Sequence, residues 1–419
     1  MSKLKVVVAG AGFAGLETAF LLRHRLHEKV DLTLVSNESD FSFRPNSIYI
    51  PFGSDEQDLK IPLVEPTTRQ NIRLMQASVQ DVDPITKTLY TDGGRLTFDK
   101  LIIATGAGMR PQEIPGLDRF GATIWTPKAM RQLGVAIERV ISRAQEGKAS
   151  TMLFLIPPNN KCAGPLYEIV MMTETHLRRK GVRKSVKLVW TTSESSYVQA
   201  FGPRLHELVT EEFANRGIEG HVAKVVREVS EASVSFADGD VIPYDELVSF
   251  PPYVAAVSYP ALPGDDRGFI ATEFESRRVR RHEHVYAPGD AGDFPVKQAF
   301  LAFLQADAVA EDIAADVLGH ERPRVTFDPV SMCVMEQFDK ATFAQVPLRL
   351  TGDPKRPVEV RPDAGRDYRV GSSPTWRLGK KLLGLYLPMR FRAGEPFHAG
   401  AAWQMMDVGL KAMSGVLAH

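Results

Sequence analysis

The feature that most constrains this chain is a glycine-rich turn between an apolar strand and a helix near the N-terminus. Residues 6–9, Val-Val-Val-Ala, are typical of a strand buried on both faces of a parallel sheet. They lead into residues 10–15, Gly-Ala-Gly-Phe-Ala-Gly, then into a helical pattern and a second apolar run at 30–35. This order predicts an α/β fold with a dinucleotide-binding turn.

The three glycines of the turn have different physical roles. Gly10 permits the tight turn, Gly12 lets the backbone approach a pyrophosphate, and Gly15 allows the helix to pack closely on the strand. The phosphates would lie at the N-terminus of the helix. The cofactor-binding residues expected in this turn are Gly10, Gly12, Phe13, Ala14 and Gly15.

The end of the second strand lacks the usual ribose-binding acid. Ser36 and Asn37 occupy the position, and Glu38 comes next. We expect Ser36 and Asn37 to line the cofactor site, but which group holds the ribose stays open.

Length and charge exclude several classes of protein. At about 100 to 200 residues per domain, 419 residues predict two or three domains. Lys plus Arg and Asp plus Glu are both 51, so no global field favours nucleic acid, and no nucleic-acid partner is expected. The N-terminus has no secretory pattern, and no apolar stretch approaches the ~18 residues of a spanning helix. A cytosolic location is therefore expected.

Two later segments distinguish FAD from a nicotinamide cofactor as the ligand of this turn. Residues 98–106 and 285–290 resemble two motifs of flavin disulfide-reductase-like proteins, and residues 77–79 match their adenine-contacting stretch. This resemblance implies an FAD domain split into 1–118 and 268–320, an inserted Rossmann-like domain at 119–267 and a C-terminal region at 321–419. The FAD contacts it implies are Val79, Ala104, Thr105, Gly106, Gly289 and Asp290.

The inserted domain lacks a second glycine-rich loop. Residues 151–156 read as a buried strand, but Pro157, Pro158 and Cys162 occupy the loop that follows, and only Gly164 remains. NAD(P)H is therefore a poor candidate for the electron donor. Cys162 and Cys333 are the only cysteines. Two unrelated buried thiols are the ordinary interpretation, whereas a disulfide in a reducing compartment is usually catalytic.

Three segments resemble the sulfide:quinone oxidoreductase family. They are residues 162–168 (Cys-Ala-Gly-Pro-Leu-Tyr-Glu), 36–46 and 331–335, and the similarity covers nearly the whole chain. The most specific element is the cysteine-containing run at 162–168, which related type II NADH dehydrogenases lack. The resemblance also assigns Arg44, within the second segment, to the cofactor site.

The resemblance implies a reaction and a set of roles. Sulfide would attack a Cys162–Cys333 disulfide to give a persulfide, and the electrons would pass through FAD to a membrane quinone. Which cysteine takes up sulfide is left open. Glu168 would handle protons, or would merely complement the helix N-terminus. That N-terminus would help keep Cys162 as a thiolate. Lys297 matches a family lysine near the flavin and quinone.

Two departures from the family pattern affect these expectations. Residues 196–202 contain no histidine, so one proton-transfer route is in doubt, and no cysteine lies in 41–47, so FAD is expected to be non-covalent. No metal site is expected.

The C-terminal region favours a membrane surface. Residues 376–386 and 403–417 have amphipathic helical spacing, and basic residues outnumber acidic ones over 354–392. The apolar stripe of the second stretch, which is expected to face the membrane interface, consists of Trp403, Met406, Leu410, Met413 and Leu417. We therefore expect a peripheral protein on the cytoplasmic side of the membrane; a homo-oligomer is left open. Two alternatives remain, a sulfide dehydrogenase with a cytochrome acceptor and a non-catalytic flavin/thiol sensor.

Overall fold

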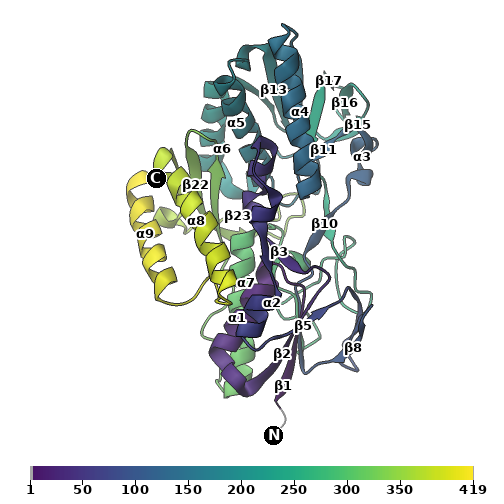
Figure 1. Cartoon of the computed structure of the whole chain (residues 1–419), viewed down its shortest axis with the longest axis vertical. Helices are drawn as coiled ribbons and strands as arrows, with labels where there is room; N and C mark the ends of the chain where they lie inside the picture. Colours follow the sequence, from purple (N-terminus) through teal and green to yellow (C-terminus); the bar gives the residue numbers. More distant parts are fainter. Residues whose placement is uncertain (1–2, 419) are drawn as a thin grey trace.

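A computed structural model describes residues 3–418, which form two parallel sheets and a C-terminal sheet flanked by helices (Figure 1). The first sheet has the strand order β20-β9-β1-β2-β5, and all its pairings are parallel. Its strands are β1 (Leu4–Ala9), β2 (Val30–Ser36), β5 (Arg73–Gln76), β9 (Lys100–Ile103) and β20 (Val285–Tyr286). A strand from the second half of the chain thus completes a sheet begun at the N-terminus.

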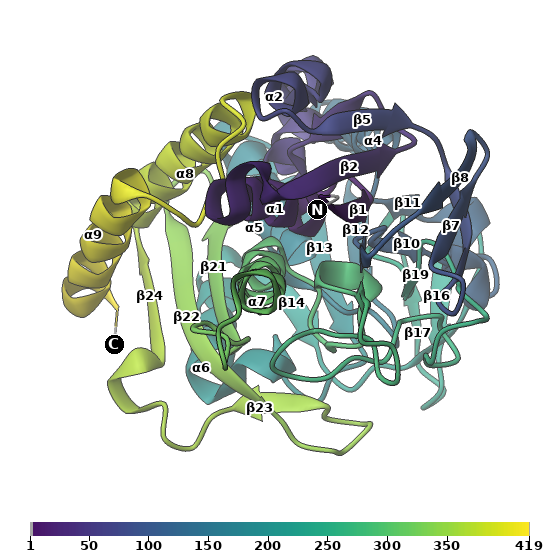
Figure 2. The ribbon, with the colours of Figure 1, turned by 90° about the horizontal axis from the view of Figure 1, so that it is seen from below.

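Two helices pack against each other beside this sheet, α1 (Phe13–Leu26) and α7 (Ala299–Leu318), as Figure 2 shows. Both are buried over most of their surface, because each is enclosed by apolar neighbours on more than one side. The smaller elements around the sheet are β3 (Asp40–Ser42), β4 (Lys60–Pro62), α2 (Val64–Arg69), β6 (Val79–Asp83), β7 (Thr88–Thr91) and β8 (Gly94–Thr97).

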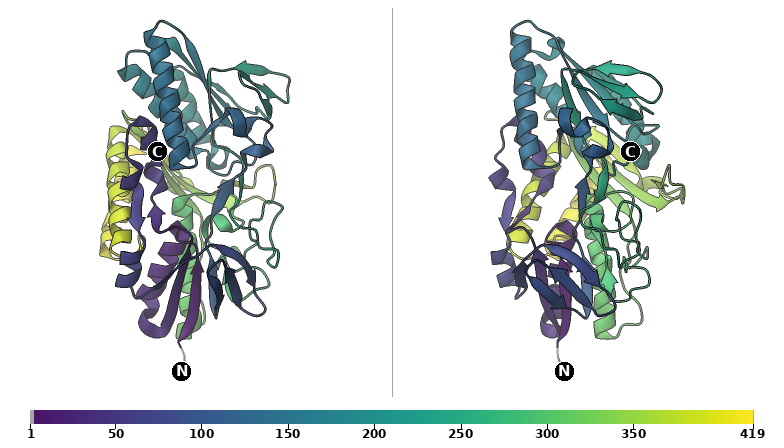
Figure 3. Two further views of the ribbon diagram at one scale, coloured as in Figure 1. Left: turned by 45° about the vertical axis from the view of Figure 1, so that its right-hand side comes forward. Right: turned by 90° about the vertical axis from the view of Figure 1, so that its right-hand side faces the viewer.

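The second sheet has the strand order β11-β18-β12-β13-β14 and is also parallel. Figure 3 shows it with its helices at the end of the molecule opposite the N-terminus. Its strands are β11 (Ala122–Thr123), β12 (Ser150–Ile156), β13 (Val186–Thr192), β14 (Ile218–His221) and β18 (Glu246–Ser249), and its helices are α3 (Leu117–Phe120), α4 (Pro127–Gln145), α5 (Gly164–Arg179) and α6 (Gly202–Arg216). An antiparallel sheet of β15 (Val226–Val229), β16 (Ser233–Phe236) and β17 (Val241–Pro243) adjoins it.

The two connections between the parallel sheets pair with each other. They carry β10 (Ala107–Met109) and β19 (Tyr253–Ala255), which are antiparallel. The chain therefore leaves the first sheet and returns to it at the same place.

The C-terminal region forms a third sheet and two helices. In the sheet, β22 (Ala341–Leu350) pairs with β21 (Val330–Glu336), β23 (Val358–Val360) and β24 (Arg369–Ser373). The helices α8 (Pro374–Arg392) and α9 (Ala401–Leu417) lie along its outer side (Figure 2). Trp376 of α8 is fully buried and stacks on Phe343 of β22, with ring centroids 4.0 Å apart. This stack attaches the helix to the sheet.

The predicted α/β class with two parallel sheets and C-terminal helices is confirmed. The structure changes the orientation expected for α9, because its predicted apolar stripe, including Trp403 and Leu410, packs inward. A different set of apolar residues faces outward on this helix, Met405, Val408 and Val416. None of the helices formed by residues 3–418 combines the length and apolar composition that a membrane crossing requires.

Candidate active site

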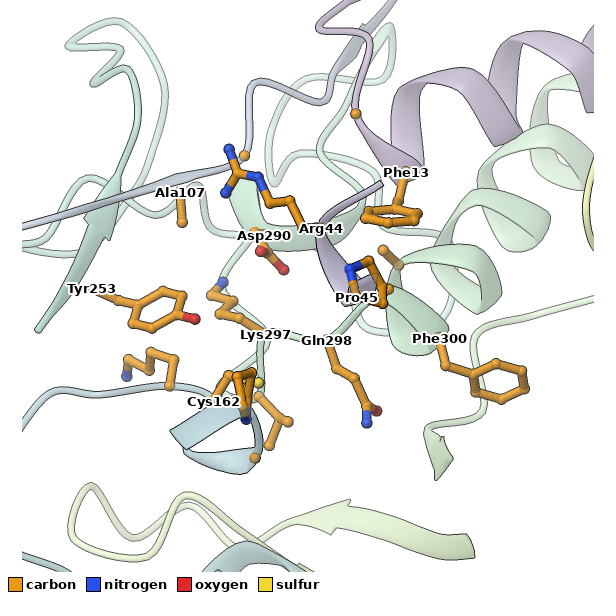
Figure 4. A pocket seen from close by; sticks show the side chains of 18 of the residues that line it. Phe13, Arg44, Pro45, Ala107, Cys162, Tyr253, Asp290, Lys297, Gln298 and Phe300 are labelled. Atoms are coloured by element: carbon orange, nitrogen blue, oxygen red, sulfur yellow. The ribbon is translucent and has the colours of Figure 1, made fainter. Parts of the chain in front are cut away.

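One cavity of about 1380 Å³ joins the three parts of the molecule. It lies at the carboxyl ends of β1, β2 and β9 in the first sheet and of β12 and β13 in the second, where parallel sheets usually bind ligands. Every predicted site residue except Gly15 and Gly289 lines it: Gly10, Gly12, Phe13, Ala14, Ser36, Asn37, Arg44, Val79, Ala104, Thr105, Gly106, Cys162, Glu168, Asp290, Lys297 and Cys333. Figure 4 shows Cys162, Lys297 and Asp290 converging near its centre.

The glycine turn has the geometry of a dinucleotide cradle. Gly10 has a φ of +111°, and a Cβ there would meet the Ala104 carbonyl oxygen at 2.3 Å. A Cβ on Gly15 would meet the Gly10 carbonyl oxygen at 1.9 Å, whereas one on Gly12 would have nothing within 4 Å. Gly10 and Gly15 are therefore required for packing, and Gly12 faces open space. No side chain caps α1, so its first N–H groups can bind a phosphate.

The loop after β12 uses its own polar groups internally. The Cys162 N–H donates to Asn160 Oδ1 at 2.9 Å, and Asn160 Nδ2 donates to the Phe250 carbonyl at 2.9 Å. Pro157 and Pro158 line the cavity without any N–H to offer. The Cys162 amide and the two prolines therefore offer no N–H group to a second pyrophosphate.

The two cysteines reach the same part of the cavity from different elements. Cys162 lies just before α5 and Cys333 lies on β21, and both are free thiols. A Cβ on Gly164, two residues after Cys162, would be 3.8 Å from Cys333 Sγ. Burial raises the pKa of the Cys162 thiol, with Cys333 adding to the effect, and burial followed by Glu168 raises that of Cys333 to about 12. Burial thus opposes the thiolate that the helix N-terminus was expected to favour.

A buried ion pair adjoins Cys333. Glu168 of α5 pairs with Lys380 of α8, and its Oε1 accepts the Glu336 N–H at 2.8 Å. Lys380 also donates to the Val334 carbonyl at 2.8 Å. Burial raises the pKa of Glu168, and Lys380 opposes that rise. Sequence reasoning counted Lys380 only as part of a basic surface, because nothing local to residue 380 indicates a partner at residue 168.

A second charged group lies on the side of the first sheet. Lys297 is buried, donates to the Gly292 carbonyl, and lies 4.0 Å from the centroid of the Phe269 ring. Burial lowers its pKa to about 7, against the effect of Asp290. Within residues 3–418 no hydrogen bond reaches the Asp290 carboxylate, although burial raises its pKa. An unpartnered carboxylate that faces the cavity can accept hydrogen bonds from a hydroxyl-rich ligand such as FAD.

Arg44 begins a 3-10 helix, η2 (Arg44–Phe52), and enters the cavity beside an aromatic wall. Its guanidinium carbon lies 4.2 Å from the centroid of the Trp125 ring, and Tyr253 lies nearby (Figure 4). Sequence reasoning missed both aromatic residues, since Trp125 lies between β11 and α4, Tyr253 lies on β19, and neither shares a motif with the glycine turn.

The far end of the cavity is apolar. Its wall combines side chains of α7, α8, α9 and the segment between the last two helices, namely Phe300, Phe303, Leu383, Leu387, Phe397, Trp403 and Leu410. These residues were not predicted as site residues. Such a wall suits a flat apolar ligand better than a charged one.

Comparisons with known proteins agree with this geometry. A model of the pyridine nucleotide-disulphide oxidoreductase family matches residues 4–141. The mouse mitochondrial sulfide:quinone oxidoreductase is 22% identical over 339 residues, which cover 78% of this chain and 74% of that protein. A type II NADH:quinone oxidoreductase of Staphylococcus aureus is 22% identical over 358 residues, covering 80% of this chain and 88% of that protein. The X-ray structure of the Aquifex aeolicus sulfide:quinone oxidoreductase has a TM-score of 0.82 at 20% identity and covers 97% of this chain and 96% of that chain.

Fold, glycine turn and sequence matches together define a flavoprotein oxidoreductase. FAD is the cofactor of this class, and the cradle at Gly12 with the free carboxylate of Asp290 fits it. Sulfide:quinone oxidoreductases match most of the chain in both sequence and structure, which confirms the resemblance found in the residues.

Proposed function

We propose that this oxidoreductase oxidises sulfide to zero-valent sulfur through a Cys162–Cys333 disulfide and passes the electrons through FAD to a membrane quinone. The observation that carries the proposal is the meeting of these two cysteines in the cofactor cavity, since they come from different elements and face the same space. The loop that would bind a nicotinamide cofactor holds Cys162 instead, which favours as electron donor a small nucleophilic anion that attacks a disulfide.

The chemistry at the cysteines balances without another reagent. Hydrosulfide attacks one sulfur of the disulfide, the S–S bond breaks, and the products are a persulfide on one cysteine and a thiolate on the other. Sulfide sulfur is oxidised and the disulfide is reduced by two electrons. Lys380 lowers the pKa of Cys333 against burial and so stabilises a thiolate there. Glu168, paired with Lys380, is placed to accept the proton that the persulfide releases.

The chain holds its cofactor with residues from both halves of the first sheet. The N-terminus of α1 and Gly12 bind the pyrophosphate, and Asp290 accepts hydrogen bonds from the ribityl hydroxyls. Lys297 is buried at the cavity wall, and negative charge on the reduced cofactor would favour its protonated form, which burial disfavours. Bound FAD supplies the capacity to take two electrons from a thiol and release them to a quinone.

The apolar end of the cavity, where the electron acceptor would bind, supports a quinone held in a membrane. The apolar end of the cavity lies among α7, α8 and α9, and the latter two helices present exposed apolar side chains outward. On α8 these are Leu378, Leu382, Leu385 and Met389. Basic residues such as Lys381 lie on the same helix, which suits an anionic lipid surface. We therefore propose peripheral binding to the cytoplasmic face of a membrane.

Anaerobic titration of the purified flavoprotein tests the donor. Sulfide is expected to bleach the flavin absorbance promptly, whereas NADH should leave the absorbance unchanged. Addition of a soluble quinone to the sulfide-reduced protein should restore the flavin absorbance. Prompt bleaching by NADH and none by sulfide would overturn the proposal. Reduction by sulfide without multiple turnovers in the presence of quinone would favour the sensor alternative, and turnover with cytochrome c alone would favour the cytochrome alternative.

A further inference from the structure

A buried acid–imidazole cluster lies directly behind the apolar end of the cavity. It joins Glu17 of α1, Asp307 of α7 and His398 of the segment between α8 and α9. His398 Nδ1 is hydrogen-bonded to Asp307 Oδ2, and both Glu17 oxygens accept backbone N–H groups, from Phe397 at 2.7 Å and His398 at 2.8 Å. The cysteine chemistry and the cofactor cradle use none of these groups.

The imidazole is also in contact with the cavity wall. The His398 ring centroid lies 4.4 Å from that of Trp403 and 5.8 Å from that of Phe300, and both aromatic residues line the cavity. Within residues 3–418 the other ring nitrogen, Nε2, has no hydrogen-bond partner. One nitrogen is thus held by a carboxylate while the other is free.

We propose that His398, oriented by Asp307 and supported by Glu17, supplies a proton to the quinone as it is reduced at the apolar end of the cavity. This inference rests on the proposed function, which supplies the two electrons. Reduction of a quinone to a quinol consumes two electrons and two protons. One proton passes from the imidazolium of His398 to a quinone oxygen, directly or through one water, and leaves a neutral imidazole that solvent reprotonates; the second proton comes from solvent.

The charges around the cluster favour a protonated imidazole. Burial alone would lower the pKa of His398, but the hydrogen bond and the charge of Asp307 raise it above the usual value. Burial followed by Asp307 raises the pKa of Glu17 to about 8, so this carboxyl group is largely neutral at pH 7. An imidazolium paired with one carboxylate is the proton-loaded state that the proposal requires.

The other charged groups facing the cluster are already paired. Arg25 of α1 pairs with Glu311 of α7 and donates to the Asp307 carbonyl, while Arg390 of α8 donates to the Pro396 and Ala399 carbonyls. Asp407 of α9 is bound by Lys411. Tyr386 of α8 lies against Phe397, and its buried hydroxyl has no hydrogen-bond partner within residues 3–418; burial raises its pKa, so it stays neutral. Among the groups facing the cavity wall here, His398 is therefore the one whose ring contacts that wall with one nitrogen free to exchange a proton.

Separate measurement of the two half-reactions tests the proposal. H398Q and D307N are compared with H24Q, which changes an exposed histidine of α1. The flavin is reduced with sulfide, or with dithionite to make the test independent of the donor, and then mixed rapidly with a soluble quinone over a range of pH. We expect H398Q to be reduced by sulfide at a rate within about twofold of the parent, but to be reoxidised about 10- to 100-fold more slowly, with a flattened pH profile. D307N keeps a hydrogen-bonding side chain beside His398 and is the variant used for the test if H398Q does not fold.

An NMR titration provides a readout that does not depend on turnover. In histidine-labelled protein, D307N should shift the midpoint of the His398 signal to lower pH, because the carboxylate that favours the imidazolium is removed. Parental reoxidation rates and pH profiles in both variants, or an unchanged His398 midpoint in D307N, would overturn the inference. Failure of the parental protein itself to react with quinone would overturn the proposed function and this inference together, so the two failures are distinguishable.

Discussion

At the scale of single residues, two thiols that are far apart in the chain face one cavity. Cys162 lies at the N-terminal end of α5, and Cys333 reaches it from a strand of a different sheet. Because burial disfavours the charged form of both thiols, a thiolate at either position depends on nearby cations, of which Lys380 is one.

Replacing either cysteine should therefore abolish sulfide turnover. We expect C162S and C333S each to lower the rate of sulfide-dependent quinone reduction by at least about 1,000-fold, because neither can form the disulfide. The FAD content should remain at the parental level, since neither thiol is needed for the cradle. Near-normal turnover of either variant in a spectrophotometric quinone assay would rule out the pair.

The pH dependence of the sulfide half-reaction should report Glu168. Burial raises its pKa, so it becomes protonated at a higher pH than an exposed glutamate and stops accepting protons there. The rate of flavin reduction by sulfide should accordingly fall as the pH is lowered, at a pH above the usual range of a glutamate. E168Q should be slow at all pH values, and its pH profile should lack this acid limb. An unchanged acid limb in E168Q, measured by rapid mixing, would assign it to another group.

At the scale of elements, the strand–turn–helix unit of β1 and α1 separates two uses of glycine. Gly15 is a packing residue, because a Cβ there would overlap the Gly10 carbonyl, whereas the space beside Gly12 is open. The same residue type thus serves the fold at one position and the ligand at another.

Substitutions at these two glycines should have opposite consequences. G12V should fold with a circular-dichroism spectrum and urea midpoint close to those of the parental apoprotein, but should bind FAD at least about tenfold more weakly, because its side chain fills the phosphate approach. G15V should lower the urea midpoint strongly or prevent folding. FAD binding by G12V at parental affinity, measured by fluorescence quenching, would show that the cofactor does not approach this residue.

The outer face of α8 provides the element-scale test of membrane binding. Leu382 is 56% exposed and Leu385 is 71% exposed, and each would transfer its side chain into the interface. At about 1.5–3 kcal/mol per buried leucine, L382E and L385E should each weaken binding to anionic vesicles about tenfold or more. The control V135E changes a residue that is 64% exposed on α4, a helix of the second parallel sheet. Equal loss in the control during vesicle sedimentation would contradict a specific surface.

At the scale of the whole molecule, the cavity is bounded by both parallel sheets and the C-terminal region. A ligand that fills it contacts all three parts of the chain at once. Binding energy therefore contributes directly to the stability of the assembled fold.

Removal of FAD should lower the thermal midpoint of the whole chain. A ligand present at 100 times its Kd stabilises by about 2.7 kcal/mol, and a shift of several degrees is expected in calorimetry. Adding FAD back should restore the midpoint, whereas adding NADH should not. Full stabilisation by NADH would indicate a second dinucleotide site.

Local sequence patterns were sufficient for much of this description. The glycine spacing at 10–15, the apolar strands and the helical spacings at 376–386 and 403–417 are properties of neighbouring residues, so they predicted the α/β class and the C-terminal helices correctly. The cofactor contacts of the glycine turn stay a prediction. The local patterns did not reveal the orientation of α9 or the partner of Lys380. Helical periodicity identifies an apolar stripe, but its surroundings depend on contacts with distant elements.

By itself, the sequence determined that the chain builds a dinucleotide turn at its first strand and carries a cysteine where a second such turn would lie, because both are encoded within a few adjacent residues. Only the tertiary structure decided which distant side chains those residues contact. It brings β21 beside the start of α5, buries Lys380 against Glu168 and sets His398 on Asp307. Contacts of this kind depend on how three separate parts of the chain pack around one cavity, and no short-range pattern specifies them.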